Sequence, residues 1–250
     1  MSMTDACLLV DNSNTRTKFA LRGCGGKFEV RVLPTADISA SAVQGLLRGW
    51  AFTRVCLCSV VPRAAALIRQ ILSGYPFLLV GPDACPDVDF STYPGVETLG
   101  ADRVANVLAA VAQLPLPLVA VDLGTAATFD VVTGGENAPV FRGGAIAPGY
   151  AAVASALCSR TALLPDCPES ASGRIIAQNT HEAMCSAVRV GYPGMVDAIL
   201  DAVESELGES VNVVLTGGDA AAIAPLMRRK CRIEPALTLQ GIALAAGLRV

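Results

Sequence analysis

Short apolar runs alternate along the chain with polar turns and with longer segments that have helical spacing. One apolar run, predicted as a strand over 116–121, leads through Asp122 and Gly124 into a second predicted strand over 127–133. Gly124 has no Cβ, so the backbone N–H groups of this turn can approach an anion closely. The pattern therefore predicts a hairpin that presents oxygens and amides to a charged ligand.

The same pattern occurs near the start of the chain. There an apolar run ends at Asp11, passes through a turn rich in hydroxyl groups and continues as a second strand up to Leu21. When the two copies are aligned on their Asp residues, Ser13 falls opposite Gly124. The separation is too large for a solenoid repeat, so we expect two related halves, spanning 1–116 and 117–250.

Other predicted elements alternate between strands and helices in both halves. We expect strands over 28–33, 54–61, 77–81 and 211–215, helices over 40–50, 63–72, 101–113, 150–158, 181–191 and 240–248, and a glycine-bracketed loop over 143–149. The βββαβα order of the first half is typical of an actin-like ATPase half-domain. The expected fold class is therefore α/β, with two ribonuclease H-like halves, mixed sheets flanked by helices, and a nucleotide cleft between the halves.

Composition excludes several classes of protein. Of 250 residues, 52% are hydrophobic and 16% are charged, which argues against disorder and favours a heavily buried protein. A formal net charge of −3 argues against a nucleic-acid partner. No apolar run is long enough to span a membrane, and the first residues lack the basic start of a signal peptide. We therefore expect a soluble cytoplasmic protein.

Cysteine and histidine suggest no metal or hydrolase chemistry. The nine Cys include no C-x-x-C pair, and Cys56 and Cys58 lie in a strand-like run, so we expect buried, reduced thiols. A Ser-His-Asp hydrolase or a His-rich metal site would depend on His181, the only His in the chain.

A charged pair opens the helix predicted over 101–113. Asp102 in the first turn interacts favourably with the helix dipole, which is a sufficient structural reason for an acid there. A functional interpretation is also open, because Asp102 and Arg103 together offer a carboxylate and a guanidinium to one small polar substrate. The pattern alone does not decide between these two interpretations.

Seven motifs in one order make the chain resemble the type III pantothenate kinases over essentially its full length. They are DNSNTRTK (11–18), SVVP (59–62), GADR (100–103), DLGTAATFD (122–130), GGAIAPG (143–149), NT (179–180) and TGG (216–218). The resemblance implies ATP-dependent phosphorylation of pantothenate to 4'-phosphopantothenate, the first step of coenzyme A biosynthesis. It also implies a homodimer, ATP with Mg²⁺, and K⁺ or NH₄⁺ as a monovalent cation.

The same resemblance assigns roles to individual residues. The ATP-binding residues would be Asp11, Asn12, Ser13, Asn14, Thr15, Arg16, Thr17 and Lys18 of the first phosphate loop, together with Thr125. Asp11 would also hold magnesium through water, and Asp122 would bind the monovalent cation. The pantothenate site would be lined by Tyr93, Gly100, Ala101, Asp102, Arg103 and Thr180. Asp102 would be the proton acceptor, and Thr180 would reach the substrate of the partner subunit. On the residues alone, Thr180 is as well explained as a helix N-cap, and Lys18 as a solvated strand end.

The chain departs from the family pattern at a few positions. Ser13 stands where the family has Gly, and a Ser limits φ and narrows the backbone approach to phosphate. Ala177 and Ala187 also replace expected glycines on either side of Thr180. Two alternatives to a pantothenate kinase therefore stay open: a kinase-like regulatory or binding protein with weak or lost ATP turnover, and a kinase of this superfamily for another small molecule.

Overall fold

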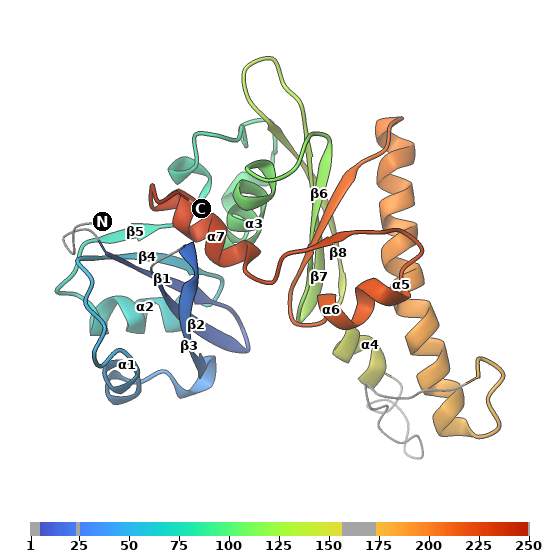
Figure 1. Cartoon of the computed structure of the whole chain (residues 1–250), viewed down its shortest axis with the longest axis horizontal. Helices are drawn as coiled ribbons and strands as arrows, with labels where there is room; N and C mark the ends of the chain where they lie inside the picture. Colours follow the sequence, from blue (N-terminus) through green and yellow to red (C-terminus); the bar gives the residue numbers. More distant parts are fainter. Residues whose placement is uncertain (1–5, 24–25, 157–173, 250) are drawn as a thin grey trace. The chain divides into compact units, whose positions relative to one another are not determined.

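The computed structural model describes residues 6–23, 26–156 and 174–249, which form two units (Figure 1). The first unit contains the described residues of 1–114, 132–142 and 236–250, and the second contains those of 115–131 and 143–235. The chain first passes from one unit to the other between residues 114 and 115. Residues 132–142 and the C-terminal segment from 236 belong to the first unit.

The first unit is built on a five-stranded mixed sheet. Its strand order is β3-β2-β1-β4-β5, with β1 antiparallel to β2 and parallel to β4. The strands are β1 (Cys7–Asn12), β2 (Arg16–Arg22), β3 (Phe28–Pro34), β4 (Arg54–Ser59) and β5 (Phe77–Leu79). The α-helices of this unit are α1 (Ala40–Leu46), α2 (Pro62–Ile71), α3 (Ala101–Val111) and α7 (Leu237–Ala245).

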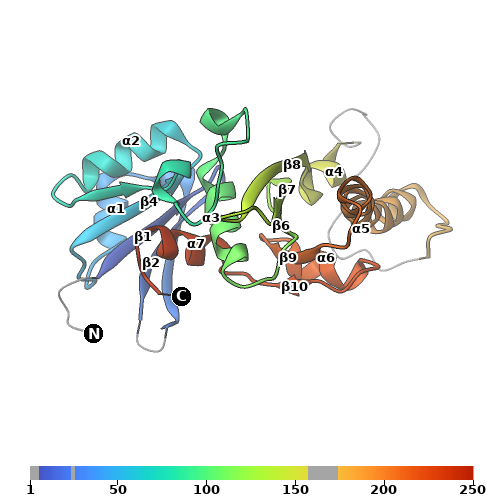
Figure 2. The same ribbon diagram turned by 90° about the horizontal axis from the view of Figure 1, so that it is seen from above.

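Helices cover both faces of this sheet, and this explains why every residue of β1 is buried (Figure 2). On one face, α1 and α2 pack Val43 and Ile68 against Leu8, Val10 and the strands around them. On the other face, α7 contacts β1 and β4, and α3 packs along α7. The end of β1 is thereby fixed from both sides.

The second unit repeats this topology. Its sheet has the order β10-β9-β6-β7-β8, which matches the first sheet strand for strand when β6 is equated with β1. The elements are β6 (Leu118–Leu123), β7 (Ala126–Thr133), β8 (Val140–Pro148), β9 (Asn212–Thr216), β10 (Arg232–Ile233), α4 (Tyr150–Ser155), α5 (Thr180–Leu207) and α6 (Ala220–Ile223). Asp11 and Asp122 are each the last but one residue of the equivalent strands β1 and β6. The internal repeat predicted from the sequence is confirmed.

Two predicted elements of the second unit are wrong. The segment 143–149, expected as a loop, lies largely within β8, and α5 runs well beyond the expected end at Gly191 to Leu207. Pro193 lies inside α5, where Tyr192, Val196 and Leu200 pack into the core of the unit. This packing outweighs the cost of the missing backbone hydrogen bond. The helix ends where Gly208 adopts a φ of 73°.

Among the residues that the structure describes, the cysteines follow the sequence prediction with one exception. Cys7, Cys56, Cys58, Cys85 and Cys231 are free, and four of the five are buried. Cys185 is disulfide-bonded, so the expectation of reduced thiols is wrong for that residue. The helix expected over 150–158 is α4, which ends at Ser155; the last two expected positions, 157 and 158, lie outside the described part of the chain.

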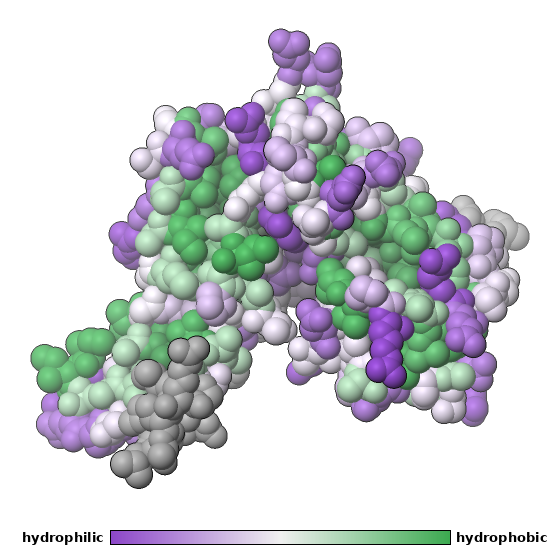
Figure 3. Space-filling model, turned by 180° about the vertical axis from the view of Figure 1, so that it is seen from behind, coloured by the Kyte–Doolittle hydropathy of each residue, from purple (hydrophilic) through white to green (hydrophobic). Residues whose placement is uncertain are grey.

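Hydrophobic areas remain on the surface, shown in green in Figure 3. Exposed large apolar side chains include Ile146, Ile176 and Val190 in the second unit. Within the described residues, none of the helices combines the length and apolar character needed to cross a bilayer.

A network of charges joins α5 to the segment before β10, and its central carboxylate is buried. The Arg228 backbone N–H donates to Asp197 Oδ2 at 2.8 Å, and Arg229 Nε lies 3.6 Å from Asp197 Oδ1. Asp201 contacts the same two arginines from the surface. The buried Asp197 therefore holds the chain between α6 and β10 against α5.

Replacing Asp197 with Ala is expected to lower the free energy of unfolding by about 2 kcal/mol. This is less than the loss for a fully buried pair, because both arginines reach solvent. Chemical denaturation measures the loss. The matched control is Asp201→Ala, a half-exposed partner whose loss should lower the free energy of unfolding clearly less. Equal losses for the two variants would contradict the central role of Asp197.

Candidate functional site

Asp11 is a buried residue at the base of the first hairpin. It is 3% exposed, and its Oδ1 accepts a hydrogen bond from Ser13 Oγ at 3.0 Å. Its Oδ2 pairs with Lys18 Nζ at 3.1 Å, across the register in which Asp11 faces Lys18 on β2. Lys18 therefore does not simply extend into solvent, because its ammonium lies at the buried acid of the loop.

Ser13 fits its turn without backbone strain. None of the non-glycine residues in the described chain has a positive φ, so the turn does not use the conformation for which Gly would be required. The Ser13 backbone N–H donates to the Arg16 carbonyl at 3.2 Å and closes the turn. The predicted restriction of φ by Ser13 is therefore not a defect of this loop.

The other loop residues divide into an exposed tip and a buried base. Asn14, Thr15 and Arg16 are exposed at the tip of the hairpin. Asn12 and Thr17 are buried, and Asn12 Nδ2 donates to Thr17 Oγ1 at 2.7 Å. The side chains at the base therefore support the loop, whereas the tip is open to a ligand.

Asp102 lies at the start of α3, and its carboxylate folds back over the helix end. Asp102 Oδ1 accepts the Arg103 backbone N–H at 2.8 Å. A Cβ on Gly100 would lie only 2.6 Å from the same oxygen. Gly100 thus leaves the space that the carboxylate occupies, which gives a physical reason for the Gly in GADR.

The Asp11 carboxylate acts electrostatically on Asp102 within the first unit. Burial raises the pKa of the Asp102 carboxyl above its usual value, the Arg103 backbone N–H lowers it, and the Asp11 carboxylate raises it further. The buried thiol of Cys58 on β4 senses both acids: burial raises its pKa well above the usual value, and the charges of Asp11 and Asp102 add to this effect. Val60 lies between the two motifs that carry these acids, because its N–H donates to the Asn12 carbonyl at 3.1 Å and a Cβ on Gly100 would lie 3.5 Å from its Cγ1.

The side chains of Tyr93 and Arg103 both lie against the ring of Phe141. The Tyr93 ring stands edge-on to Phe141 with centroids 5.1 Å apart, and the Arg103 guanidinium lies 5.8 Å from the same ring centroid. Phe90 packs on Phe141 from another side, at 5.4 Å. Phe141 is the second residue of β8, and it was not predicted as a site residue, because a single Phe in an apolar run carries no signal of function.

The second hairpin, in the second unit, is enclosed by two close backbone approaches. The Gly149 N–H donates to the Thr125 carbonyl at 3.2 Å, and the Asp219 N–H donates to the Leu123 carbonyl at 3.0 Å. A Cβ on Gly149 would lie 2.1 Å from the Gly124 oxygen. Thr125 itself is exposed at the tip of this hairpin.

Asp122 lies against the turn that follows β9. Gly217 there has a φ of 95°, and a Cβ on it would lie 2.5 Å from Asp122 Oδ1. Burial raises the pKa of the nearby Tyr192 hydroxyl to about 12, and the Asp219 and Asp122 carboxylates contribute to the shift. The TGG motif therefore has a Gly at position 217 because its backbone lies close to the Asp122 carboxylate of the second hairpin.

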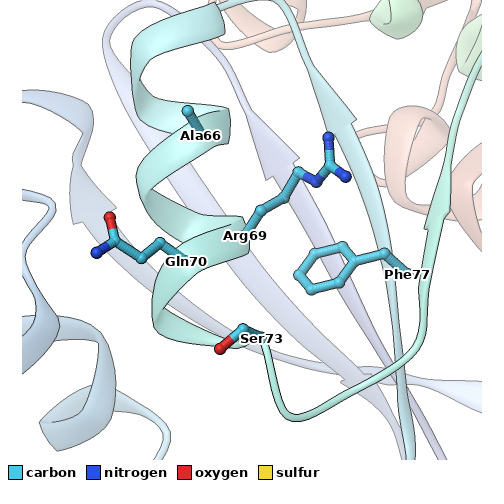
Figure 4. A pocket seen from close by; sticks show the side chains of 5 residues that line it. All are labelled: Ala66, Arg69, Gln70, Ser73 and Phe77. Carbon is cyan, nitrogen blue, oxygen red and sulfur yellow. The ribbon is translucent and has the colours of Figure 1, made fainter.

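A hollow on the first unit is separate from these groups. It lies between α2 and β5 and is lined by Ala66, Arg69, Gln70, Ser73 and Phe77, with Arg69 beside the Phe77 ring (Figure 4). None of the residues that the sequence motifs assign to the site lines it. Its lining offers no carboxylate to accept a proton, so it is not the candidate site.

The model of the type III pantothenate kinase family matches residues 7–202. The chain belongs to this family. A type III pantothenate kinase from Akkermansia muciniphila is 41% identical over 245 residues, covering 97% of this chain and 99% of the relative. Another, from Methylacidiphilum infernorum, is 35% identical and covers 95% of this chain and 86% of that relative.

Solved structures agree with the fold of this type III pantothenate kinase family member. A Baf family transcriptional activator from Campylobacter jejuni aligns with a TM-score of 0.64 at 18% identity, covering 96% of this chain and 97% of that one. A glucokinase from an Antarctic psychrotroph aligns with a TM-score of 0.53 at 12% identity, covering 97% and 98%. At these identities the likeness concerns the fold alone, which is the expected pair of actin-like ATPase half-domains.

Thr180 is not the N-cap of α5 in this family member. The N-cap of α5 is Asn179, whose Oδ1 accepts the Glu182 backbone N–H at 2.9 Å. Thr180 is the first residue of the helix and is exposed. The interpretation of Thr180 as the N-cap is therefore wrong, and its hydroxyl is open to solvent in the second unit.

Proposed function

We propose that this protein transfers the γ-phosphoryl group of ATP to the primary hydroxyl of pantothenate and yields 4'-phosphopantothenate, the first step of coenzyme A biosynthesis. Membership of the family supports the reaction. The observation that carries the assignment to residues is that Val60 connects the two motifs: its N–H donates to the Asn12 carbonyl at 3.1 Å, and a Cβ on Gly100 would lie 3.5 Å from its Cγ1. A phosphate loop and a proton acceptor are needed in one place for this chemistry.

Asp102 would accept the proton of the attacking hydroxyl. Phosphoryl transfer passes through a loose transition state, so the acceptor has mainly to orient the hydroxyl and take its proton late. Burial raises the pKa of Asp102, which makes the carboxylate a better base than an exposed Asp. Arg103 would pair with the pantothenate carboxylate, and Tyr93 and Phe141 would form an apolar wall beside it.

The carboxylates fit the ions that the family uses. Asp11 offers the hard oxygen ligand that Mg²⁺ prefers, and a single carboxylate suits an ion that keeps most of its waters. Asp122 lies beside the backbone of Gly217, so it can share a monovalent cation with main-chain oxygens. When bound, magnesium would neutralise phosphate charge, while Lys18, already at Asp11, would add a second positive charge at the loop.

The purified protein tests this proposal. It is incubated with ATP, Mg²⁺ and K⁺, with and without pantothenate, and phosphopantothenate is measured directly by mass spectrometry. Omission of K⁺ tests the proposed dependence on a monovalent cation separately. ATP binding without any phosphopantothenate would overturn the proposed function and favour a regulatory protein of the same fold; product formed with a different alcohol would favour another kinase.

A homodimer is the second part of the proposal, and we place its contact on α5. Between Ala183 and Ala198 every exposed position of this helix is Ala, Val or Gly: Ala183, Ala187, Val190, Gly191, Gly194 and Ala198. A Cβ on Gly191 or Gly194 would meet nothing within 4 Å, so the protomer itself does not explain these glycines. An uncharged face of small residues suits close packing with the same helix of a second copy.

Replacing Ala187 with Glu is expected to convert the dimer into a monomer, because the change buries a carboxylate without a partner in the contact. Light scattering coupled to gel filtration measures the mass, and circular dichroism checks that the fold persists. The matched control is Ala66→Glu on α2, another exposed helical Ala. A dimer that survives Ala187→Glu would place the contact elsewhere.

A further inference from the structure

A chain of polar side chains runs through the interior of the first unit to the first phosphate loop. Asn12 and Thr17 are 1% and 0% exposed, although both are polar. Ser59 Oγ, at the end of β4, donates to Asn12 Oδ1 at 2.6 Å, and Asn12 Nδ2 donates to Thr17 Oγ1 at 2.7 Å. The three side chains thus join the end of β4 to the base of the hairpin.

Thr35 is the last side chain of this hydrogen-bonded series, and it binds the loop directly. Thr35 lies just after β3, outside the motif 11–18, and its Oγ1 is 3.0 Å from Thr17 Oγ1. Thr35 Oγ1 also donates to the Ser13 carbonyl at 2.7 Å. Its backbone N–H donates to the Thr15 carbonyl at 3.0 Å. Thr35 therefore holds the loop on both sides of Asn14.

The hydrogen bonds in this series of polar side chains all have the same donor-to-acceptor direction. A hydroxyl has one proton, so Thr35, which donates to the Ser13 carbonyl, must accept from Thr17. At the other end Ser59 Oγ accepts the Val61 backbone N–H at 3.1 Å, at the start of α2. Bonds aligned in this way polarise one another, and a partly broken chain would leave buried polar atoms without partners.

Thr35, at the end of this hydrogen-bonded series of side chains, sets the direction of a backbone amide. The carbonyl of Ser13 and the N–H of Asn14 belong to one planar trans peptide, so they point in opposite directions. By holding the Ser13 carbonyl toward the interior, Thr35 turns the Asn14 N–H toward the open tip of the loop. Backbone N–H groups turned outward from a tight loop are the groups that bind phosphate oxygens.

We infer that Thr35 is a positioning residue for the nucleotide: it presents the backbone N–H of Asn14 to the phosphates without touching them. This inference rests on the proposed function, since it concerns the same ATP site. It also explains how the loop keeps its shape with Ser at position 13, because the Ser13 carbonyl and hydroxyl are both bound, to Thr35 and Asp11.

The test compares Thr35→Val with Thr35→Ser. Valine keeps the shape of the side chain but removes the hydroxyl, so the KM for ATP and the Kd for MgATP should rise about tenfold, whereas the KM for pantothenate should change less than about twofold. Serine restores the hydroxyl and should restore affinity for ATP. The matched control is Thr53→Val, which removes an exposed hydroxyl bonded to the Ala6 carbonyl elsewhere in the same unit and should leave both constants unchanged.

Calorimetric binding of MgATP separates this inference from the proposed function, because it needs no acceptor. If the wild type binds MgATP without phosphorylating pantothenate, the proposed function fails while the Thr35 comparison still stands. Equal affinity in wild type and Thr35→Val, or no recovery in Thr35→Ser, would overturn the inference, and so would a wild type that binds no nucleotide. If Thr35→Val does not fold, Ser59→Ala breaks the same chain at its far end; an unchanged Kd there would be equally decisive against it.

Discussion

Replacing Asp102 with Asn is expected to lower kcat by about 10²- to 10⁴-fold while MgATP still binds. The amide keeps the size of the carboxyl group and can still lie in the space left by Gly100, but it cannot take the proton of the attacking hydroxyl. Asp11 and Lys18 stay in place, so the proposed phosphate loop is unaffected. Turnover and calorimetric Kd measured on one preparation distinguish loss of chemistry from loss of binding.

The same substitution is expected to raise the melting temperature at neutral pH. Burial raises the pKa of Asp102, so the folded state binds this proton more tightly than the unfolded state does. Stability therefore falls as pH rises from the unfolded pKa through the raised folded pKa, and the penalty is complete above it. Asparagine has no such penalty, and its advantage should disappear when the pH falls below both values.

Melting curves of both proteins at several pH values check this sign. Asp83→Asn is the matched control, because Asp83 is exposed in the same unit and its replacement should change neither kcat nor the melting temperature appreciably. Turnover retained in Asp102→Asn would remove Asp102 from the proposed chemistry. A lower melting temperature for Asp102→Asn at neutral pH would contradict the burial penalty instead.

The sequence predicted the parts of the molecule whose causes are local. An apolar run that ends in Asp and a small-residue turn is a strand followed by a hairpin wherever it occurs, and both copies were found at equivalent strands. The start of α3 was likewise predictable, since Gly100 and Asp102 act within one turn of each other. Local geometry explains why these motifs keep their residue types.

The remaining features depend on contacts between distant segments. Gly191, Pro193 and Gly194 suggest a helix end, yet α5 continues because its far turns bury Val196 and Leu200. Phe141 meets Tyr93 and Arg103 only because β8 lies beside the loop at Asp89. Thr35 supports a loop more than 15 residues earlier in the chain through side-chain hydrogen bonds, for which spacing gives no signal.

The contact between α3 and α7 joins two segments far apart in the chain, and Gly241 is its closest point. A Cβ on Gly241 would lie 1.8 Å from the Ala105 oxygen and 2.4 Å from the Ala105 carbonyl carbon. These are backbone atoms, so no side-chain rotation can relieve the overlap. The helices pack this closely only because position 241 has no side chain.

Replacing Gly241 with Ala is therefore expected to lower the free energy of unfolding by about 3 kcal/mol, at the upper end of the cost of overpacking. Denaturant titration measures this value. Gly45→Ala in α1 is the matched control: a Cβ there meets nothing within 4 Å, so the change should stabilise the protein by about 0.5–1 kcal/mol. A Gly241→Ala protein as stable as the wild type would contradict the close packing of α3 on α7.

Activity of the folded Gly241→Ala protein adds a second measurement. Ala105 lies one turn after Asp102 on α3, so helices forced apart at Ala105 should also displace the carboxylate. At a temperature where the variant is still folded, kcat should fall by about tenfold, because a displacement near 1 Å in an acceptor group already slows transfer strongly. A folded variant with full activity would show that α3 can shift along α7 without moving Asp102, and would separate the stability of this contact from its role in the site.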